Sequence, residues 1–329
     1  MKVALIGLGS VGRGVATMLA KKKDLGLTIT GIADSKSGLA EDTGIDIKKV
    51  LAAKKKTGMC GDAGISATDV IKNADYDALI EVTPTNALSG EPATGYIRTA
   101  LNRKKHVVTS NKGPVALSYR ELRALAQKKG VAFRYEATVA GAIPIMHTLE
   151  YGLAGNEILA LYGVLNGTCN FILTRMADEG LTYEQALMEA REMGYAEADP
   201  TYDVQGIDAA IKLVILANAI WGNGVKLADV DRTGIDLLTA DALRLAEEEG
   251  CTIRLIAEAN PRKNLIRVSP RIIEKTHPLV VDGSLNALTL ETDMAKEITL
   301  IGRGAGSVET ASAIIGDLLF IQDRYVQRA

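Results

Sequence analysis

The segment VALIGLGSVG at residues 3–12 decides how the first half of this chain folds. Its apolar start, Val3–Ile6, fits a buried parallel strand. Gly7, Gly9 and Gly12 follow with the spacing GxGxxG, and apolar residues then recur at helical spacing. A strand, a glycine turn and a helix in this order are typical of a dinucleotide-binding site. The glycines let the backbone approach a pyrophosphate, and the N-terminus of the helix faces its negative charge.

An acidic residue follows the next predicted strand. Residues 28–33 read TITGIA and lead into Asp34. This is about 20 residues after the glycine turn, where a carboxylate binds the ribose hydroxyls of NAD. The same carboxylate would repel the 2′-phosphate of NADP, whereas Lys36 and the lysine run 54–56 could accommodate that phosphate. A lysine run is more commonly a solvated helix face. We expect both cofactors to be used.

The composition indicates a soluble enzyme. With 329 residues, 47% of them hydrophobic, the chain can bury a large core and is expected to form two domains. A net charge of −2 gives no reason to expect nucleic acid or an anionic membrane as a partner. The apolar stretches are too short for a membrane span, and the N-terminus is a strand rather than a signal peptide. Three cysteines without metal-ligand spacing favour a reduced, cytoplasmic setting.

Strands and helices alternate to about residue 135, which predicts a parallel sheet. The predicted strand 77–82 leads into Thr83 and Pro84, and the predicted strand 106–109 leads into the polar turn 110–114. Ligands bind at the carboxyl edge of such sheets. Lys112 is therefore a candidate active-edge lysine, although a solvated turn explains it equally well.

The pattern changes in the second half of the chain. Apolar segments predict a mostly antiparallel sheet, with helices from 170 to 247 packed on one face; the segments lie near 158–165, 252–258, 264–268 and 285–290. The glycine-rich turn 301–306 is expected to open a last helix that returns to the first domain. The expected fold class is α/β, with a Rossmann domain over 1–135, completed by 301–329, and an α+β domain over 136–300.

A lysine stands in the middle of one of the most apolar predicted helices. Residues 206–217 read GIDAAIKLVILA, and their only charges are Asp208 and Lys212. Four residues apart, the two side chains project from one face of a helix. Burying an ammonium there costs several kcal/mol unless it is paired or lines a wet cleft. Either a structural ion pair or a polar substrate pocket would explain the pattern.

The segment before this helix is rich in acid. Residues 194–203 read GYAEADPTYD, and Asp203 is a plausible N-cap for the helix. Asp199 is best explained as a solvated loop residue. Glu197 together with Asp208 could hold a substrate ammonium, while Lys212 serves an oxygen or a carboxylate of the same substrate.

Five segments together resemble the homoserine dehydrogenases, in the short form without a C-terminal regulatory domain. Three of the segments are specific to this family: SNKGPVA at 110–116, GVLNGTCN at 163–170, and 194–212. The other two are 7–12 and 302–306, and the five segments together span nearly the whole chain.

The resemblance implies a reversible, NAD(P)H-dependent reduction of L-aspartate 4-semialdehyde to L-homoserine, a step toward threonine, methionine and isoleucine. It places Lys212 and Lys112 close to the reacting oxygen, and Glu197 and Asp208 at the α-ammonium. The residues expected to contact the cofactor are Gly7, Gly9, Ser10, Val11, Gly12, Asp34, Lys36, Thr83, Pro84, Ser110, Lys112 and Gly306.

The resemblance also implies a bound monovalent cation, usually sodium, that fixes the loop between the domains. Backbone oxygens would hold it, at the positions matching Glu136, Val139, Gly141 and Ile143. The resemblance further implies a cytoplasmic homodimer, with residues 136–300 as the substrate-binding and dimerisation domain.

Two alternatives stay open on the sequence. One is a different Rossmann oxidoreductase, such as a sugar or amino-acid dehydrogenase with an antiparallel second domain. The other is a non-catalytic dinucleotide sensor, which should carry a partner-binding or DNA-binding module. No basic recognition helix is visible in the sequence.

Overall fold

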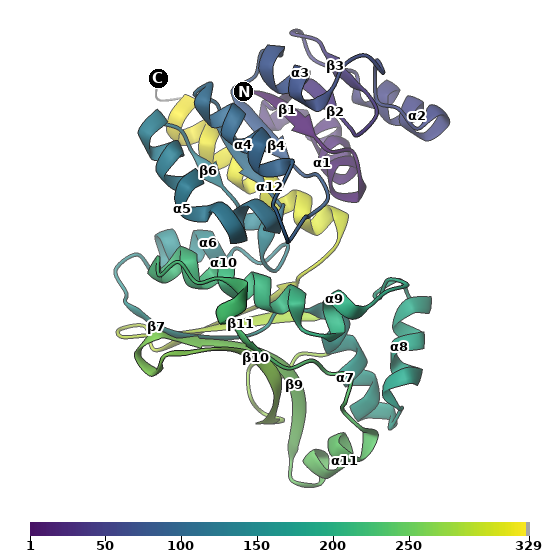
Figure 1. Ribbon diagram of the computed structural model, residues 1–329, viewed down its shortest axis with the longest axis vertical. Coiled ribbons are helices and arrows are strands. Elements are labelled where there is room, and N and C mark those ends of the chain that lie inside the picture. The colour runs from purple at the N-terminus through teal and green to yellow at the C-terminus, as the bar shows by residue number, and fades with distance from the viewer. Residues whose placement is uncertain (327–329) are drawn as a thin grey trace. The chain divides into compact units, whose positions relative to one another are not determined.

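A computed structural model describes residues 1–326 of the chain. The residues form two compact units, which Figure 1 colours by position in the sequence. The first unit contains Met1–Ala142 and the chain from Gly306 onward, and the second unit contains Ile143–Ala305. The C-terminal helix thus belongs to the N-terminal unit, as the sequence indicated.

The first unit is built on a six-stranded sheet with the order β3-β2-β1-β4-β5-β6. All neighbouring strands are parallel except β3, which runs antiparallel to β2. The strands are β1 (Lys2–Ile6), β2 (Thr28–Ala33), β3 (Gly38–Ala40), β4 (Ala78–Glu81), β5 (His106–Thr109) and β6 (Phe133–Arg134). The helices are α1 (Ser10–Lys21), α2 (Ile47–Thr57), α3 (Ala67–Asn73), α4 (Ala93–Asn102), α5 (Lys112–Lys129) and α12 (Ser307–Ile321).

The central strand β1 is buried on both faces of the sheet, and each face packs against helices through apolar side chains. Val3 and Leu5 join one apolar cluster, which includes residues of α1 and α12. Ala4 and Ile6 point the other way and join a second cluster with residues of α3, α4 and α5. Successive side chains of a strand point to opposite faces, so β1 contributes to the apolar core on each face of the sheet. The predicted Rossmann-type domain is confirmed.

The second unit has a six-stranded sheet with the order β12-β11-β7-β9-β10-β8. Every pairing is antiparallel except that of β10 with the short β8. The strands are β7 (Ile158–Val164), β8 (Asp231–Arg232), β9 (Cys251–Asn260), β10 (Leu265–Glu274), β11 (Leu285–Thr292) and β12 (Glu297–Arg303). The helices are α6 (Ile145–His147), α7 (Gly167–Glu179), α8 (Tyr183–Glu192), α9 (Thr201–Val204), α10 (Ile207–Trp221) and α11 (Ala240–Glu248). The expected α+β domain with a mostly antiparallel sheet is confirmed.

The unit boundaries differ from the expected ones, 135/136 and 300/301. Only the second half of the predicted glycine-rich turn 301–306 precedes the last helix, because Ile301–Arg303 complete strand β12 and α12 begins at Ser307. The ladder decides this: Ile301 pairs with Ala287, and Arg303 pairs with Leu285. The boundaries therefore fall after Ala142 and after Ala305.

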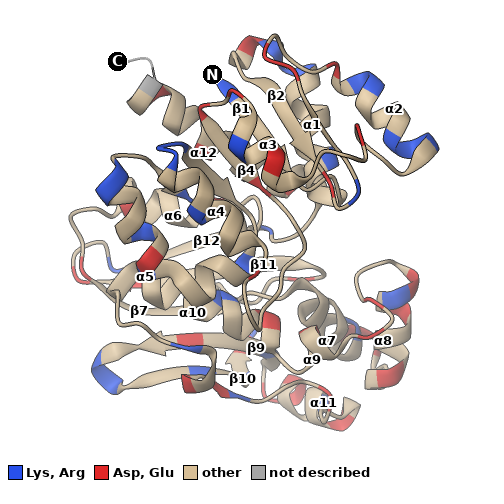
Figure 2. Ribbon diagram, turned by 45° about the horizontal axis from the view of Figure 1, so that its top comes forward, with Lys and Arg blue, Asp and Glu red and all other residues tan. Residues whose placement is uncertain are grey.

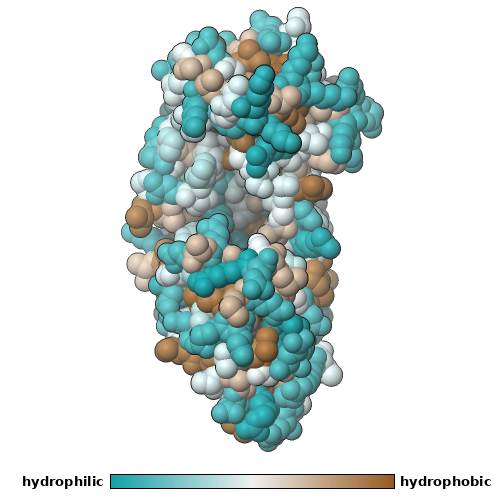
Figure 3. Space-filling view, turned by 90° about the vertical axis from the view of Figure 1, so that its right-hand side faces the viewer, coloured by the Kyte–Doolittle hydropathy of each residue, from teal (hydrophilic) through white to brown (hydrophobic). Residues whose placement is uncertain are grey.

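None of the helices within residues 1–326 is both long enough and apolar enough to cross a bilayer. On the face shown in Figure 3, hydrophilic residues predominate and apolar ones are scattered between them. A scattered apolar surface of this kind needs no special explanation.

Candidate functional site

In the glycine turn after β1, close backbone contacts leave no room for a side chain at two of the three glycines. Gly7 has a φ of 104°, and a Cβ there would lie 2.6 Å from the carbonyl oxygen of Val82. A Cβ on Gly12 would lie 1.9 Å from the carbonyl oxygen of Gly7. A Cβ on Gly9 would meet no protein atom within 4 Å. Packing therefore does not require a glycine at position 9, as expected where the backbone must come close to a ligand.

The expected cofactor residues of the first unit gather at one edge of its sheet. Strand β1 lies between β2 and β4, so the strand order reverses beside it, and ligands bind at such a switch point. The turn after β1, Thr83–Pro84 after β4, and Ser110–Lys112 after β5 all follow carboxyl ends of these parallel strands. Lys112 is the first residue of α5 rather than part of a free turn. Their roles in binding stay predictions.

The last helix adds a further segment to this edge. A Cβ on Gly14 of α1 would lie only 2.5 Å from the carbonyl oxygen of Ser307. The start of α12 therefore packs directly on α1. Gly306, with a φ of 128°, immediately precedes α12, whose start packs on α1, the helix that completes the dinucleotide motif. The contact of Gly306 with the cofactor stays a prediction.

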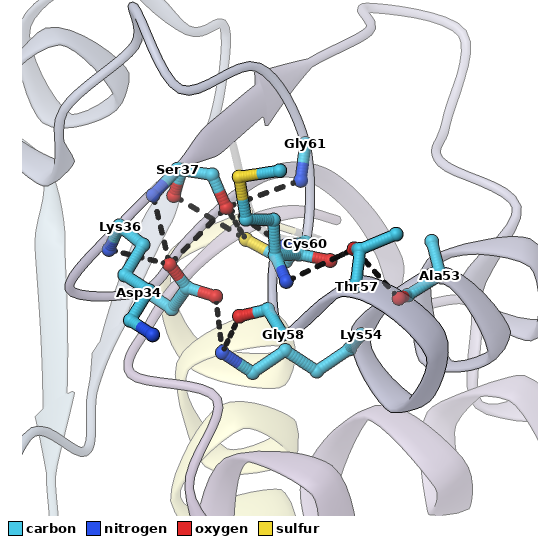
Figure 4. A network of polar contacts seen from close by, with 10 residues as sticks. Asp34, Lys36, Ser37, Ala53, Lys54, Thr57, Gly58, Cys60 and Gly61 are labelled. Carbon is cyan, nitrogen blue, oxygen red and sulfur yellow. Dashed lines mark hydrogen bonds and ion pairs between the residues drawn. The ribbon is translucent and has the colours of Figure 1, made fainter.

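Asp34 is held by a network of donors, shown in Figure 4. Its Oδ1 accepts hydrogen bonds from the backbone N–H groups of Lys36 (2.7 Å) and Ser37 (2.8 Å). Its Oδ2 accepts one from Nζ of Lys54 at 2.5 Å, and Lys54 also donates to the carbonyl of Gly58. Burial acts to raise the pKa of Asp34, but these hydrogen bonds lower it below its usual range. Asp34 is a buried, charged carboxylate that already has a cation beside it.

The lysine run 54–56 therefore divides into two kinds of residue. Lys55 and Lys56 are exposed on α2, as a solvated face would be, whereas Lys54 turns toward Asp34. The side chain of Lys36 is exposed, and the backbone N–H of Lys36 makes its hydrogen bond with Asp34. Of the lysines considered for the 2′-phosphate, Lys54 is the one held at the end of β2.

Glu81, at the end of β4, is a buried carboxylate that the sequence reasoning missed. It accepts hydrogen bonds from the backbone N–H (2.8 Å) and the hydroxyl (2.5 Å) of Thr83, and from the hydroxyl of Thr109 (2.8 Å). Its complete burial raises its pKa, although these hydrogen bonds oppose the shift. The sequence does hold a signal for Glu81, because an acidic residue at the end of an otherwise apolar strand is unusual. Glu81 ties the ends of β4 and β5 together at the edge expected to bind the cofactor.

We expect Glu81→Gln to stabilise the protein at alkaline pH and to have less effect at acidic pH. The raised pKa means that the folded protein binds the Glu81 proton more tightly than the unfolded chain does. Stability is therefore lost as the pH rises from the unfolded pKa through the folded pKa. A neutral glutamine avoids this loss. Thermal unfolding midpoints across a pH series would check it. An equal effect at every pH would contradict the assignment.

In the second unit, Lys212 is paired inside the protein. It is 8% exposed and its partner Asp208 is 4% exposed, on a helix that is almost wholly buried and appears mostly tan in Figure 2. Nζ of Lys212 lies 2.8 Å from Oδ2 of Asp208 and donates to the carbonyl oxygen of Leu165 at 2.7 Å. Among the described residues these are its two acceptors, which account for two of the three N–H groups of the ammonium.

Asp203 is not the N-cap of this helix, contrary to the prediction. Gly206, with a φ of 72°, occupies that position, and Asp203 lies in the preceding short helix α9. The side-chain amide of Asn166 joins the two acids, since its Nδ2 donates to Oδ1 of Asp203 at 2.7 Å and to Oδ2 of Asp208 at 2.9 Å. The sequence reasoning missed both Asn166 and Asp203 as site residues, because an N-cap was the simplest local role for Asp203.

Glu197 stands apart from this network. It is exposed, in the segment before α9, and makes no hydrogen bond or ion pair with the other described residues. The segment is anchored nearby, because the Thr168 hydroxyl donates to the carbonyl of Tyr195 at 2.7 Å. Asp199 is exposed as well, in agreement with its prediction as a solvated loop residue. Thus Asp208 and Lys212 come together, while Glu197 faces solvent.

The loop expected to hold a cation is buried and turns sharply. Ala140 and Gly141 have φ values of 55° and 52°, and such a conformation is unusual for alanine. The backbone N–H of Glu136 donates to Oδ2 of Asp317 on α12 at 3.0 Å. Within residues 1–326 no cluster of three or more His, Cys, Asp or Glu side chains could hold a metal.

Comparisons with known proteins identify relatives over the whole chain. Residues 7–136 match the model of the homoserine dehydrogenase NAD-binding domain, and residues 144–319 match that of homoserine dehydrogenase. The chain is 45% identical to a homoserine dehydrogenase from Methanocaldococcus jannaschii, with 98% of each chain covered. It is 38% identical to an NAD(+)-dependent homoserine dehydrogenase from Pseudomonas canavaninivorans, with 97% of this chain and 96% of the relative covered. A solved hyperthermophilic archaeal homoserine dehydrogenase in complex with NADPH is 30% identical, with a TM-score of 0.84 and 98% of each chain covered.

Proposed function

The chain belongs to the homoserine dehydrogenase family, and from this premise we propose that it reduces L-aspartate 4-semialdehyde reversibly to L-homoserine with NAD(P)H, on the route to threonine, methionine and isoleucine. Membership of this family of NAD(P)-dependent oxidoreductases argues against a different dehydrogenase and against a non-catalytic sensor. The observation that carries the proposal is the buried Asp208–Lys212 pair, whose ammonium keeps one N–H for a substrate oxygen.

Each residue has a defined task in this mechanism. NAD(P)H, when bound, supplies the hydride to the aldehyde carbon. Lys212 donates a hydrogen bond to the carbonyl oxygen and gives it a proton as the carbinol forms, and Lys112 assists at the same oxygen. Asp208 orients the ammonium of Lys212. Asp208 and Glu197 also attract the α-ammonium of the substrate, which fixes the aldehyde end relative to Lys212.

The direct test is turnover by the purified full-length chain. NADH and NADPH oxidation should be rapid with aspartate 4-semialdehyde and slow with a panel of other small aldehydes and ketones. The assay is run in sodium chloride and in choline chloride at equal ionic strength, so that a sodium requirement is seen as a loss of rate in choline. Better turnover of a carbonyl without an α-amino group would overturn the proposal.

We propose that the enzyme uses both cofactors, with Asp34 and Lys54 as the two determinants. Asp34 provides a carboxylate for the ribose hydroxyls of NAD, and Lys54, held on Asp34, provides a cation for the 2′-phosphate of NADP. The ion pair also neutralises part of the repulsion that Asp34 alone would exert on that phosphate. One relative is named as NAD(+)-dependent and another was solved in complex with NADPH, which is consistent with the use of both cofactors.

Single substitutions should separate these two roles. Lys54→Ala should raise the KM for NADPH by roughly ten- to a hundredfold, the usual value of a hydrogen bond to a charged group, and should affect NADH less. Asp34→Ala should weaken NADH and spare NADPH. Lys36→Glu should weaken NADPH through charge repulsion. The matched control is Lys55→Ala, which removes an exposed lysine from the same helix. If Lys54→Ala behaves as Lys55→Ala does, phosphate recognition lies elsewhere.

We propose that the cation binds the loop that joins the two units, through backbone oxygens of Glu136, Val139, Gly141 and Ile143. The buried, sharply turned backbone at Ala140 and Gly141 supports this, because a turn of this kind can direct several carbonyl groups of one short segment toward one point. The cation would hold the loop and take no chemical part in hydride transfer.

We also propose a cytoplasmic homodimer formed through the sheet of the second unit. Strand register places Glu258, Arg267 and Ile301 on one face of this sheet, and Ile301 is 53% exposed. Glu258 binds Arg267 at 2.6 Å and lies 3.8 Å from Arg271. A face with both charges and an exposed apolar residue can complement its own copy across a twofold axis. Light scattering coupled to gel filtration measures the assembly.

A further inference from the structure

Asn166 occupies the point at which three elements of the second unit converge. It follows strand β7, is only 4% exposed, and caps α7 through its Oδ1, which accepts a hydrogen bond from the backbone N–H of Cys169 at 2.8 Å. This bond fixes which end of the amide is the oxygen, because only an oxygen can accept from that N–H. The NH2 end must then point toward α9 and α10.

Both hydrogens of that NH2 group are used on carboxylates. One goes to Asp203 of α9 and the other goes to Asp208 of α10, at 2.7 and 2.9 Å. Two carboxylates drawn to one amide repel each other, and their charges are costly to bury without donors. Asn166 supplies one hydrogen to each carboxylate, so that both have a donor where they lie side by side.

The same oxygen of Asp208 that accepts from Asn166 also receives Nζ of Lys212. The backbone on the other side of Asn166 contributes as well, since the carbonyl of Leu165 accepts the second hydrogen bond of Lys212. Residues 165 and 166 therefore hold the catalytic lysine and its carboxylate partner from one short segment.

We propose that Asn166 is a positioning residue for substrate binding: its amide holds Asp203 and Asp208 as a pair of carboxylates that receives the α-ammonium of the substrate. Asn166 itself needs no contact with the substrate. The proposal rests on the proposed homoserine dehydrogenase activity and assigns to Asp203 a share in ammonium binding.

The test uses a variant that separates capping from positioning. Asn166→Ser retains an oxygen that can cap α7, since serine and asparagine are comparable N-caps, but it lacks the amide donors. We expect the KM for homoserine to rise roughly ten- to a hundredfold, while the KM for NADP+ is unchanged because the cofactor residues lie in the first unit. The matched control is Thr182→Ala, which removes the N-cap of α8 in the same unit without touching a carboxylate. It should lower the Tm and leave both KM values as they are.

Three outcomes would overturn the positioning role. The first is a folded Asn166→Ser variant with a normal KM for homoserine. The second is a rise in both KM values together, which indicates general loosening. The third is unfolding of both Asn166→Ser and Asn166→Thr, two residues that can cap α7 without adding a charge, which makes the role structural. Wild-type oxidation of homoserine is measured first, so that failure of the proposed function is distinguished from failure of this inference.

Discussion

Replacing Lys212 with methionine is expected to reduce kcat/KM by at least roughly a hundredfold, the lower end of what a positioned proton donor contributes. Methionine retains most of the buried stem of the lysine but donates no hydrogen bond. Lys212→Ala should be as inactive and less stable, because it also opens a cavity. Turnover, thermal unfolding and NADPH binding by fluorescence are the measurements, and cofactor binding should survive.

The buried ion pair makes a further control necessary. Removing Lys212 alone leaves Asp208 charged in a buried place, and breaking such a pair costs about 3–5 kcal/mol. The double variant Lys212→Met with Asp208→Asn removes both charges and should recover much of the lost stability without recovering activity. If Lys212→Met turns over at the wild-type rate, Lys212 is only a structural partner of Asp208.

The second large effect is expected at the ammonium site. Glu197→Gln and Asp208→Asn should each raise the KM for homoserine, and lower kcat/KM roughly ten- to a hundredfold, because each removes a charged acceptor. Asp208→Asn should have the larger effect, since Asp208 also binds Lys212 and Asn166. Glu197 is exposed and has no such partners among the described residues, so its change should act on substrate binding alone.

A substrate analogue without the amino group, 4-hydroxybutanoate, is the control for these two variants. Wild type and Glu197→Gln should be equally poor with it, because no ammonium is present to be recognised. If Glu197→Gln still loses about tenfold in kcat/KM with this analogue, Glu197 is not an ammonium ligand.

Local spacing in the sequence was sufficient to predict several parts of this molecule. A buried strand followed by GxGxxG predicted the Rossmann-type domain, because one strand, one turn and one helix are specified within a few residues. The interval of four between Asp208 and Lys212 predicted that they share a helix face, and the structure joins them at 2.8 Å. The pattern of apolar segments likewise predicted the mostly antiparallel second sheet.

Only the tertiary structure decided which distant residues meet. Asn166 reaches Asp208 across 42 positions of sequence, and Lys54 reaches Asp34 across 20. No local pattern encodes these contacts, so Asp203 was predicted as a helix cap and the lysine run 54–56 was interpreted as a solvated face. The segment 301–303 was predicted as part of a glycine-rich turn for the same reason, although pairing with β11 makes it a strand. Periodicity specifies the direction in which a side chain points along its own element. Its partner depends on which elements pack together, and that is settled by burial and hydrogen bonding over the whole domain.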